Sequence, residues 1–165
     1  MRGSVTSVRN FRPADPPSEF RFEHDIPGTP WEDEMRGLNI HAAGAMTGLP
    51  IYVDLEKAEI VWAQFLETAK YRNNVLRAVA IMVNHLRFAI QVPGDPDSTR
   101  VLGDYKAYSS RALNRRFGMP SSEWTEKGSK RKFSDDAALA AAIYYVLYKQ
   151  PKPLLVWSPE TGRIK

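Results

Sequence analysis

The clearest pattern in the chain is a strict alternation within AVAIMVNHLRFAIQV, residues 78–92. From position 85 onward, apolar side chains fill every second position: Leu86, Phe88, Ile90 and Val92. The positions between them hold His85, Arg87, Ala89 and Gln91. A period of two predicts a half-buried β-strand. His85 and Arg87 should therefore leave the same, polar face of a sheet.

Three helices are predicted from apolar stripes and capping residues, over residues 54–71, 98–117 and 134–150. Their N-caps are Asp54, Ser98 and Ser134. The stripe of the first helix consists of Ala58, Val61, Trp62, Phe65 and Ala69. In the third helix, Asp135 and Asp136 lie in the first turn, where the helix dipole favours anions, and Pro151 ends the helix.

Further strands surround the alternating segment. The run VLRAVAIMV, residues 75–83, is typical of a buried strand. Either a tight turn near Val83 and Asn84 or a bulge in one long strand joins it to the His85 strand. SSEWTEKGSKRKF predicts a loop with a short strand, and PLLVW predicts a last strand before the tail SPETGRIK. This order indicates an α+β fold, an antiparallel sheet with helices packed on one face. The polar side of the His85 strand would then be free to build a site.

Residues 1–50 differ from the rest of the chain. RPADPPSEF and DIPGTP contain prolines that exclude a helix or a central strand. Residues 31–36 can form a short helix, and GLNIHAAGAM fits no single element. We therefore predict an irregular N-terminal arm over residues 1–50 and one α+β domain over residues 51–165.

The composition is that of a globular domain with its own core. The 165 residues are 43% hydrophobic and 25% charged, which are ordinary values. The chain has no apolar run of about eighteen residues, and its first residues lack the apolar centre of a secretory signal. Cysteine is absent. We therefore expect a cytoplasmic protein with no membrane partner, no disulfides and no thiolate metal site.

Positive charge is concentrated in one region, although the net charge is only +4. Between positions 100 and 132 the bases are Arg100, Lys106, Arg111, Arg115, Arg116, Lys127, Lys130, Arg131 and Lys132. The acids that oppose them there are Asp104, Glu123 and Glu126. Such a local excess is typical of proteins with a polyanion partner, and it also occurs on solvated basic faces.

The pair His85 and Arg87 admits three interpretations. Two ligands at this spacing on a strand can chelate one metal ion. A guanidinium has no lone pair for a metal, so Arg87 suits a phosphate instead. Both side chains can also be a solvated surface pair without a function.

A tyrosine-rich helix end is the second candidate. In AALAAAIYYVLYKQ, one stripe consists of Ala138, Ala141, Tyr145 and Tyr148. Small residues before tyrosines would let this helix lie close to a sheet. A tyrosine attacks phosphate when a nearby cation or base helps to remove its proton. The alternative is that the tyrosines form the edge of the core, which is their commoner role.

The basic loop WTEKGSKRKF is the third candidate. Gly128 allows close backbone approach, and Ser129 with its basic neighbours can bind phosphate, although an exposed basic hairpin explains the same residues. Trp124 can stack on a base, but we expect it to anchor the loop in the core. The full set of DNA-contact candidates is Arg87, Lys106, Arg111, Arg115, Arg116, Lys127, Ser129, Lys130, Arg131 and Lys132.

Together these segments resemble the bacterial single-tyrosine HUH transposases, the group that includes the REP-associated tyrosine transposases. AVAIMVNHLRFAIQV is similar to the family's MPNHVHLLV strand, which carries His-hydrophobe-His. AIYYVLYKQPKPLLVW is similar to the family's tyrosine helix, and LGDYKAYSSRALNRRFG and WTEKGSKRKF fall between the two in the family's order. The likeness covers about residues 50–157.

The resemblance assigns a role to each matching residue. His85 matches the first metal-ligating histidine, and Arg87 stands where the second is expected. Tyr145 best matches the nucleophile, with Tyr144 and Tyr148 as weaker candidates. 

Gln150 resembles a further metal ligand of the family. It follows Tyr145 by five residues, where the family pattern leads us to expect four. This spacing turns it away from the tyrosine's face of the helix unless the last turn unwinds before Pro151.

The resemblance also implies a fold and an activity. The fold is a ferredoxin-like antiparallel sheet with helices on one face, the HUH endonuclease fold, in a homodimer that binds single-stranded or hairpin DNA. The activity is transposition by DNA cleavage and rejoining: Mg²⁺ or Mn²⁺ polarises the phosphate, and the tyrosine forms a 5′-phosphotyrosine.

Two departures from the family lead to an alternative function. Arg87 removes one metal ligand, and residues 1–50 show no initial strand of the kind that the family places before the first helix. The chain would then be a truncated, decayed or domesticated copy that binds nucleic acid without cutting it, in a regulatory role. A third alternative is an RNA-binding or protein-interaction domain.

Overall fold

In the computed structural model, the described residues are 2–9, 52–118, 124, 128–133 and 135–164. The chain divides into two units, residues 1–10 together with 51–165, and residues 11–50. The second unit, with the short helix predicted at 31–36, lies outside the described residues.

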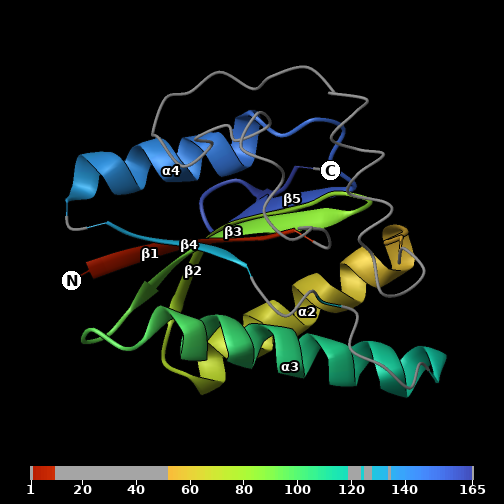
Figure 1. The fold of residues 1–165 in the computed structure, drawn as a ribbon. Helices are drawn as coiled ribbons and strands as arrows, with labels where there is room; N and C mark the ends of the chain where they lie inside the picture. Colours follow the sequence, from red (N-terminus) through yellow and green to blue (C-terminus); the bar gives the residue numbers. More distant parts are fainter. Residues whose placement is uncertain (1, 10–51, 119–123, 125–127, 134, 165) are drawn as a thin grey trace, which may run out of the picture. The chain divides into compact units, whose positions relative to one another are not determined.

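The first unit is built on a six-stranded antiparallel sheet in the order β4-β1-β3-β2-β5-β6 (Figure 1). The strands are β1 (Arg2–Arg9), β2 (Val75–Ile81), β3 (His85–Val92), β4 (Ser129–Phe133), β5 (Leu155–Ser158) and β6 (Gly162–Arg163). The helices are α2 (Leu55–Tyr71), α3 (Ser98–Phe117) and α4 (Asp136–Tyr148). The prediction of an α+β fold with an antiparallel sheet is confirmed. The run β1-α2-β2-β3-α3-β4 has the element order of the β-α-β-β-α-β motif.

Strand β1 corrects the expectation that an initial strand is missing. It pairs with β3 from Arg2 opposite Val92 to Arg9 opposite His85, and it pairs with β4 on its other side. Residues 2–9 are therefore not part of an irregular arm. Their sequence, RGSVTSVR, gives little local signal, because its strand character depends on partners more than seventy residues away.

The chain after β5 also holds a strand that we did not predict. The expected tail turns back on itself, and β6 pairs with β5 at Trp157–Arg163 and Ser158–Gly162. The Thr161 backbone N–H donates to Ser158 Oγ at 3.1 Å inside this turn. Gly162 takes a positive φ of 65°, which glycine adopts without strain.

Strands β2 and β3 form a hairpin with a tight turn. The Met82 backbone N–H donates to the His85 carbonyl at 2.8 Å, and Ile81 pairs with Leu86. Of the two predicted alternatives, the tight turn near Val83 and Asn84 is confirmed, and the single long strand is wrong. The hairpin sets the position of His85 at the start of β3.

The helices begin on aspartate caps. Asp54 Oδ1 accepts from the Lys57 backbone N–H at 2.9 Å, as predicted for α2. The other two caps are not the predicted serines: α3 is capped by Asp97, whose Oδ1 accepts from the Thr99 N–H at 3.0 Å. Asp135 caps α4 by accepting from the Ala138 N–H at 2.7 Å. A carboxylate satisfies the same orphan N–H as a serine and also interacts favourably with the helix dipole. Ser134 lies outside the described residues.

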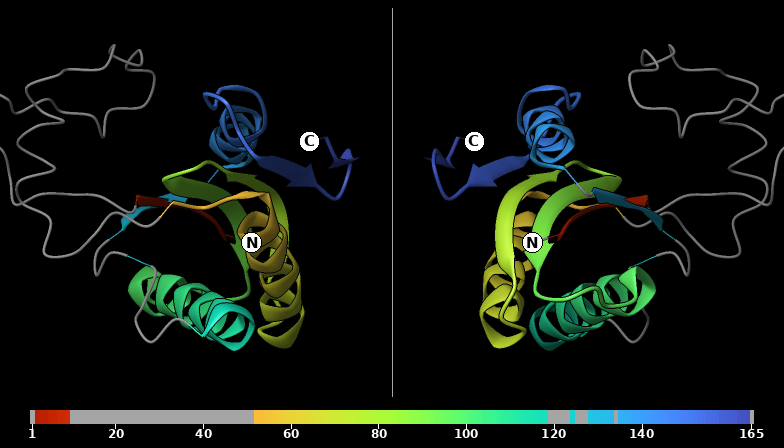
Figure 2. Two further views of the ribbon diagram at one scale, coloured as in Figure 1. Left: turned by 90° about the vertical axis from the view of Figure 1, so that its right-hand side faces the viewer. Right: turned by 90° about the vertical axis from the view of Figure 1, so that its left-hand side faces the viewer.

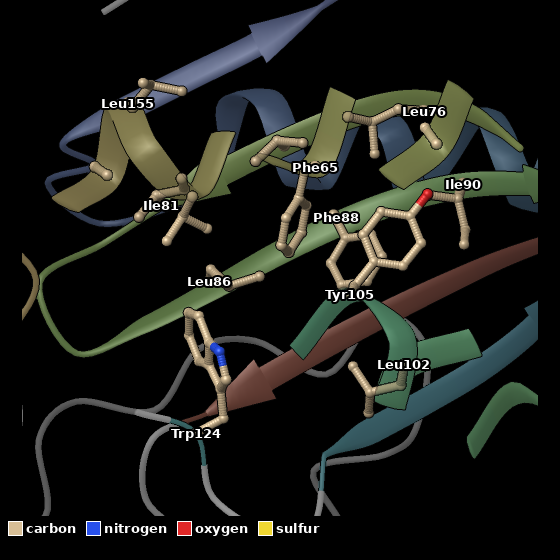
Figure 3. Packing of buried hydrophobic residues seen from close by; sticks show 14 of the residues in the cluster. Phe65, Leu76, Ile81, Leu86, Phe88, Ile90, Leu102, Tyr105, Trp124 and Leu155 are labelled. Atoms are coloured by element: carbon tan, nitrogen blue, oxygen red, sulfur yellow. The ribbon is translucent and has the colours of Figure 1, made fainter. Parts of the chain in front are cut away.

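The main core lies between the sheet and helices α2 and α3 (Figure 3). Phe65, Phe88 and Tyr105 are its centre, with ring centroids 4.9 Å apart for Phe65–Phe88 and for Phe65–Tyr105. The alternating apolar face of β3 is buried here, as predicted: Leu86, Phe88, Ile90 and Val92. Trp124 joins this cluster, so its predicted anchoring role is confirmed.

The other face of the sheet is covered by α4, which corrects the prediction that all helices lie on one face (Figure 2). Val146 packs with small and apolar side chains of the strands, namely Ala78, Ala80, Met82, Ala89 and Val156. Small side chains on β2 and β3 let a helix approach the sheet closely. The side of β3 that carries Arg87 is therefore not open to solvent. Among the described residues, no helix combines the length and apolar composition needed to cross a lipid bilayer.

Tyr105 gives this core a measurable dependence on pH. Burial raises the pKa of its phenol to about 12 from the usual value of 10, partly offset by a hydrogen bond to Asn74. Between these two values the unfolded chain has released the proton and the folded chain keeps it. The free energy of unfolding should therefore fall as pH rises through this window, by up to about 1.4 kcal/mol per pH unit.

Urea titrations of the wild type and Tyr105→Phe at several pH values measure this effect. The difference in stability between the two proteins should shrink or reverse between pH 10 and 12. Tyr52→Phe is the matched control, because Tyr52 is exposed. Stability curves for Tyr105→Phe and wild type that stay parallel above pH 10 would contradict the burial effect.

Candidate functional site

The site forms where β3 meets α4. The Arg87 guanidinium carbon lies 4.8 Å from the centroid of the Tyr145 ring. Arg87 is in the middle of the sheet, in register with Ser7 of β1 and Ala80 of β2. The resemblance pairs His85 of this strand with Tyr145, whereas the ring contact in the structure joins Tyr145 to Arg87.

Arg87 is buried, with 7% of its surface exposed, whereas Tyr145 is 40% exposed. The phenol therefore borders both the buried cation and solvent. A cation over an aromatic face is attracted by the ring, more strongly where water is excluded. This contact places the guanidinium beside the phenol ring.

The stripe that α4 presents to the sheet differs from the predicted one. Leu139 and Val146 are its buried residues, two turns apart on the helix. Ala141, Tyr145 and Tyr148, which we expected against the sheet, are exposed. Tyr145 contacts the side chain of Arg87 on β3 with its ring.

The neighbouring tyrosines form a separate pair. The rings of Tyr144 and Tyr148 lie 5.1 Å apart, and the Lys149 ammonium lies 5.8 Å from the Tyr144 ring. Both tyrosines are more than half exposed. Of the three tyrosines that the sequence offered, only Tyr145 has a ring contact with Arg87 among the described residues.

His85 begins β3 and is half-buried. Its Nδ1 lies 2.7 Å from Asn84 Oδ1, a hydrogen bond that an Nδ1–H donates. The strict alternation along β3 puts His85 on the same face as Arg87, opposite the core side chains Leu86 and Phe88. The Asn-His pair was visible in the sequence, but the role of Asn84 in orienting the imidazole was not predicted.

Gln150 lies just beyond the end of α4. The helix ends at Tyr148 with Lys149 as its C-cap, so the last predicted turn is unwound before Pro151. Gln150 Nε2 donates to the Tyr145 carbonyl at 2.7 Å. Its Oε1 is buried and has no hydrogen-bond partner in the part of the chain that the structure describes. The amide is thus tied to the residue that carries the phenol.

The side chains around Tyr145 are a poor donor set for Mg²⁺ or Mn²⁺. Within the described part of the chain, no group of three or more His, Asp or Glu side chains is placed to hold a metal ion. The candidate donors are one imidazole, from His85, and one amide oxygen, from Gln150. Hard divalent cations prefer carboxylates, and the Arg87 guanidinium on the same face of β3 as His85 repels a second cation.

The basic run on β4 is divided between the two faces of the sheet. Lys130 Nζ donates to Thr99 Oγ1 at 2.8 Å, and Lys132 pairs with Asp95 at 2.8 Å, on the side of α3. Arg131 is opposite Val5 of β1, which is in turn opposite Ala89, a residue packed beneath α4. Directly opposed residues share a face, so Arg131 is on the α4 side. We did not predict the partners Asp95 and Thr99.

Strand β4 is at an edge of the sheet. Lysines on an edge strand also hinder pairing with other chains, which is a structural reason for the same residues. Lys130 also affects the pKa of two charged groups near this edge. Burial and the nearby Lys130 lower the pKa of the Lys106 ammonium, so these two cations lie close enough to repel each other. A hydrogen bond from the Thr99 N–H, aided by Lys130, lowers the pKa of Asp97.

The other basic candidates on α3 have individual surroundings. Arg111 lies 5.0 Å from the Tyr108 ring, Arg116 pairs with Glu56 at 2.7 Å, and Arg115 is exposed. Lys127 and the side chain of Ser129 lie outside the described residues.

Comparisons with known proteins give one structural likeness. No protein-family model and no curated protein sequence matches the chain. Among solved structures, a REP-associated tyrosine transposase bound to a REP hairpin is similar, with 10% sequence identity and a TM-score of 0.46. The alignment covers 88% of this chain and 62% of that chain, so this chain spans less than two thirds of its length.

Proposed function

We propose that this protein is a transposase-like DNA-binding protein that recognises single-stranded or hairpin DNA, and that Tyr145 attacks a DNA phosphate. The observation that carries the proposal is the contact of 4.8 Å between the Arg87 guanidinium and the Tyr145 ring. A cation that binds phosphate and a nucleophile that attacks phosphate are thereby held in the same place.

The sequence resemblance supports the same residues independently. It matches Tyr145 to the family's nucleophile and His85 to the first residue of its conserved pair. In a protein of this kind, a second copy of the chain would bind beside the first, and a homodimer is part of the proposal.

The proposed reaction is a transesterification. The phenolic oxygen of Tyr145 forms a bond to phosphorus, and the bond from phosphorus to the 3′ oxygen breaks. The products are a 5′-phosphotyrosine and a 3′-hydroxyl, which takes up the proton that the phenol loses. No atom is oxidised or reduced, and attack by the 3′-hydroxyl reverses the step. Arg87 stabilises the negative charge that gathers on the phosphate oxygens.

The direct test is a search for the covalent product. The purified chain is incubated with labelled hairpin oligonucleotides, denatured and separated by electrophoresis, and a labelled band at the mass of protein plus DNA supports the proposal. Mass spectrometry of the peptide that contains residues 136–148 identifies the modified residue.

A second candidate function is DNA binding without cleavage. The specific observation in its favour is Arg87 itself, which stands where the resemblance expects a metal-ligating histidine. In this case the cations of β4 and α3 carry the affinity for the phosphate backbone, and removing the Tyr145 hydroxyl has no effect on binding.

The salt dependence of binding tests whether these cations contact DNA phosphates. Replacing Lys130, Arg131 and Arg115 with glutamine should weaken binding to hairpin DNA and lower the slope of log K against log salt by about 2–3. Fluorescence anisotropy at several salt concentrations measures this slope. Arg163→Gln is the matched control, because β6 lies at the opposite edge of the sheet from β4. An unchanged slope in the triple variant would exclude these residues as phosphate contacts.

A further inference from the structure

Among the described residues, no anion pairs with the buried guanidinium of Arg87. Arg87 is 7% exposed and contacts the Tyr145 ring, and its Nε is buried with no hydrogen-bond partner among the described residues. In the described part of the chain, no carboxylate pairs with it. Buried charges in proteins are normally paired, and an unpaired N–H donor in the interior is costly. The arrangement is that expected of a site whose anion comes from outside the chain.

The chemistry of the group indicates which anion fits. A guanidinium is a planar fork of N–H donors whose spacing matches two oxygens of a phosphate. Tyr145 is partly exposed, so its side of the guanidinium is the side from which a ligand in solvent can approach. An oxyanion there would lie against both the N–H donors and the phenol.

The same site is unfavourable for the divalent cation that the sequence resemblance implies. The donors that the resemblance names are the His85 imidazole and Gln150 Oε1, an atom that is buried without a hydrogen-bond partner among the described residues. Neither donor carries negative charge, and His85 shares a face of β3 with the Arg87 guanidinium. The positive charge that a metal would bring to the phosphate is already supplied by Arg87.

We propose that Arg87 takes the place of the metal: it binds a phosphate group of a nucleic acid strand directly, and binding at this site needs no divalent cation. The proposal rests on the proposed function for the identity of the ligand. It differs from a purely structural role, in which Arg87 only supports the Tyr145 ring.

The test measures phosphate binding at Arg87 itself, in the full chain and in the presence of EDTA. Inorganic phosphate and a short single-stranded oligonucleotide are titrated while the arginine Nε–H signals are followed by ¹⁵N NMR. The Arg87 signal should shift with both ligands. Its assignment comes from its loss in Arg87→Lys. An arginine that only supports the ring would not respond to inorganic phosphate.

Three variants give the affinity of the oligonucleotide by calorimetry. Arg87→Ala should weaken binding about 10- to 100-fold. Arg87→Lys should recover part of this loss, because the charge remains and the fork is lost. Arg77→Ala is the matched control: this second arginine of the sheet is held by Gln91 and Glu160, so its removal should leave the affinity unchanged. Circular dichroism checks that each variant is folded, and the NMR titration of the wild type needs no variant.

A fourth variant, Arg87→His, creates a His-x-His pair with His85. It should gain Mn²⁺ binding, detected by electron paramagnetic resonance, whereas the wild type should not bind Mn²⁺.

The proposal is overturned if the Arg87 signal does not respond to phosphate, or if Mg²⁺ or Mn²⁺ strengthens oligonucleotide binding of the wild type about tenfold. If Tyr145 forms no DNA adduct but the Arg87 signal responds, the proposed catalysis fails and this inference stands. If an adduct forms only in the presence of a metal ion, the proposed catalysis stands and this inference fails.

Discussion

Tyr145→Phe is expected to abolish the covalent adduct between the protein and hairpin DNA, while leaving the fold unchanged. Phenylalanine keeps the ring that lies 4.8 Å from the Arg87 guanidinium and removes only the oxygen that attacks phosphorus. Loss of a nucleophile typically lowers a rate by about 10³-fold or more. The adduct band on a denaturing gel should therefore fall below detection.

The adjacent tyrosines provide matched controls for this experiment. Tyr144→Phe and Tyr148→Phe remove the same hydroxyl from rings that pair with each other and lack the contact with Arg87. Both variants should form the adduct at the wild-type rate. An adduct that survives in Tyr145→Phe, or that maps to Tyr144 or Tyr148, would reject Tyr145 as the nucleophile. If the wild type itself forms no adduct, DNA binding without cleavage becomes the better description.

Elements with strong local signals could be predicted from the sequence. Helix α2 starts after Asp54 and ends at Tyr71 as expected, because a capping side chain and an apolar stripe act within the segment itself. The buried face of β3 follows from its period of two. These signals depend only on neighbours along the chain.

Strand β1 and the position of α4 on the other face of the sheet could not be predicted in this way, because they depend on partners distant in sequence. Residues 2–9 become a strand by pairing with β3 and β4. Helix α4 is rich in alanine, so its apolar pattern does not reveal which side is buried. The run AVAIM in β2 did carry a usable signal: a strand that is apolar on both faces indicates cover on both faces.

The candidate site could be predicted only in part, because the sequence does not reveal that α4 covers this face of β3. The strand with His85 and Arg87 and the helix with Tyr145 could be identified as candidates from the sequence. We expected the polar side of the strand to be free, whereas α4 buries Arg87 there. Burial changes the chemistry, since an arginine in water needs no partner and a buried arginine does. The residue pattern within β3 does not predict the burial of Arg87.

Phe88→Ala is expected to be the most destabilising single change among those considered. Phe88 is fully buried, between Phe65 at 4.9 Å and Tyr105 at 5.1 Å, and it adjoins Arg87 on β3. Truncating a buried phenylalanine removes its transfer free energy and leaves a cavity, which together cost about 3–5 kcal/mol. The melting temperature should fall by about 6–20 °C. Thermal and urea unfolding followed by circular dichroism measure both quantities.

Tyr52→Ala is the aromatic control for this change, since Tyr52 is 60% exposed and should alter stability by no more than about 0.5 kcal/mol. A loss of less than about 1 kcal/mol in Phe88→Ala would mean that the three-ring cluster is not the centre of the core. The result also bears on the site, because β3 carries Phe88 on one face and Arg87 on the other. If Phe88→Ala stays folded at low temperature but binds oligonucleotide more weakly, the packing beneath the strand fixes the position of the guanidinium above it. Unchanged binding would mean that α4 alone holds Arg87 in place.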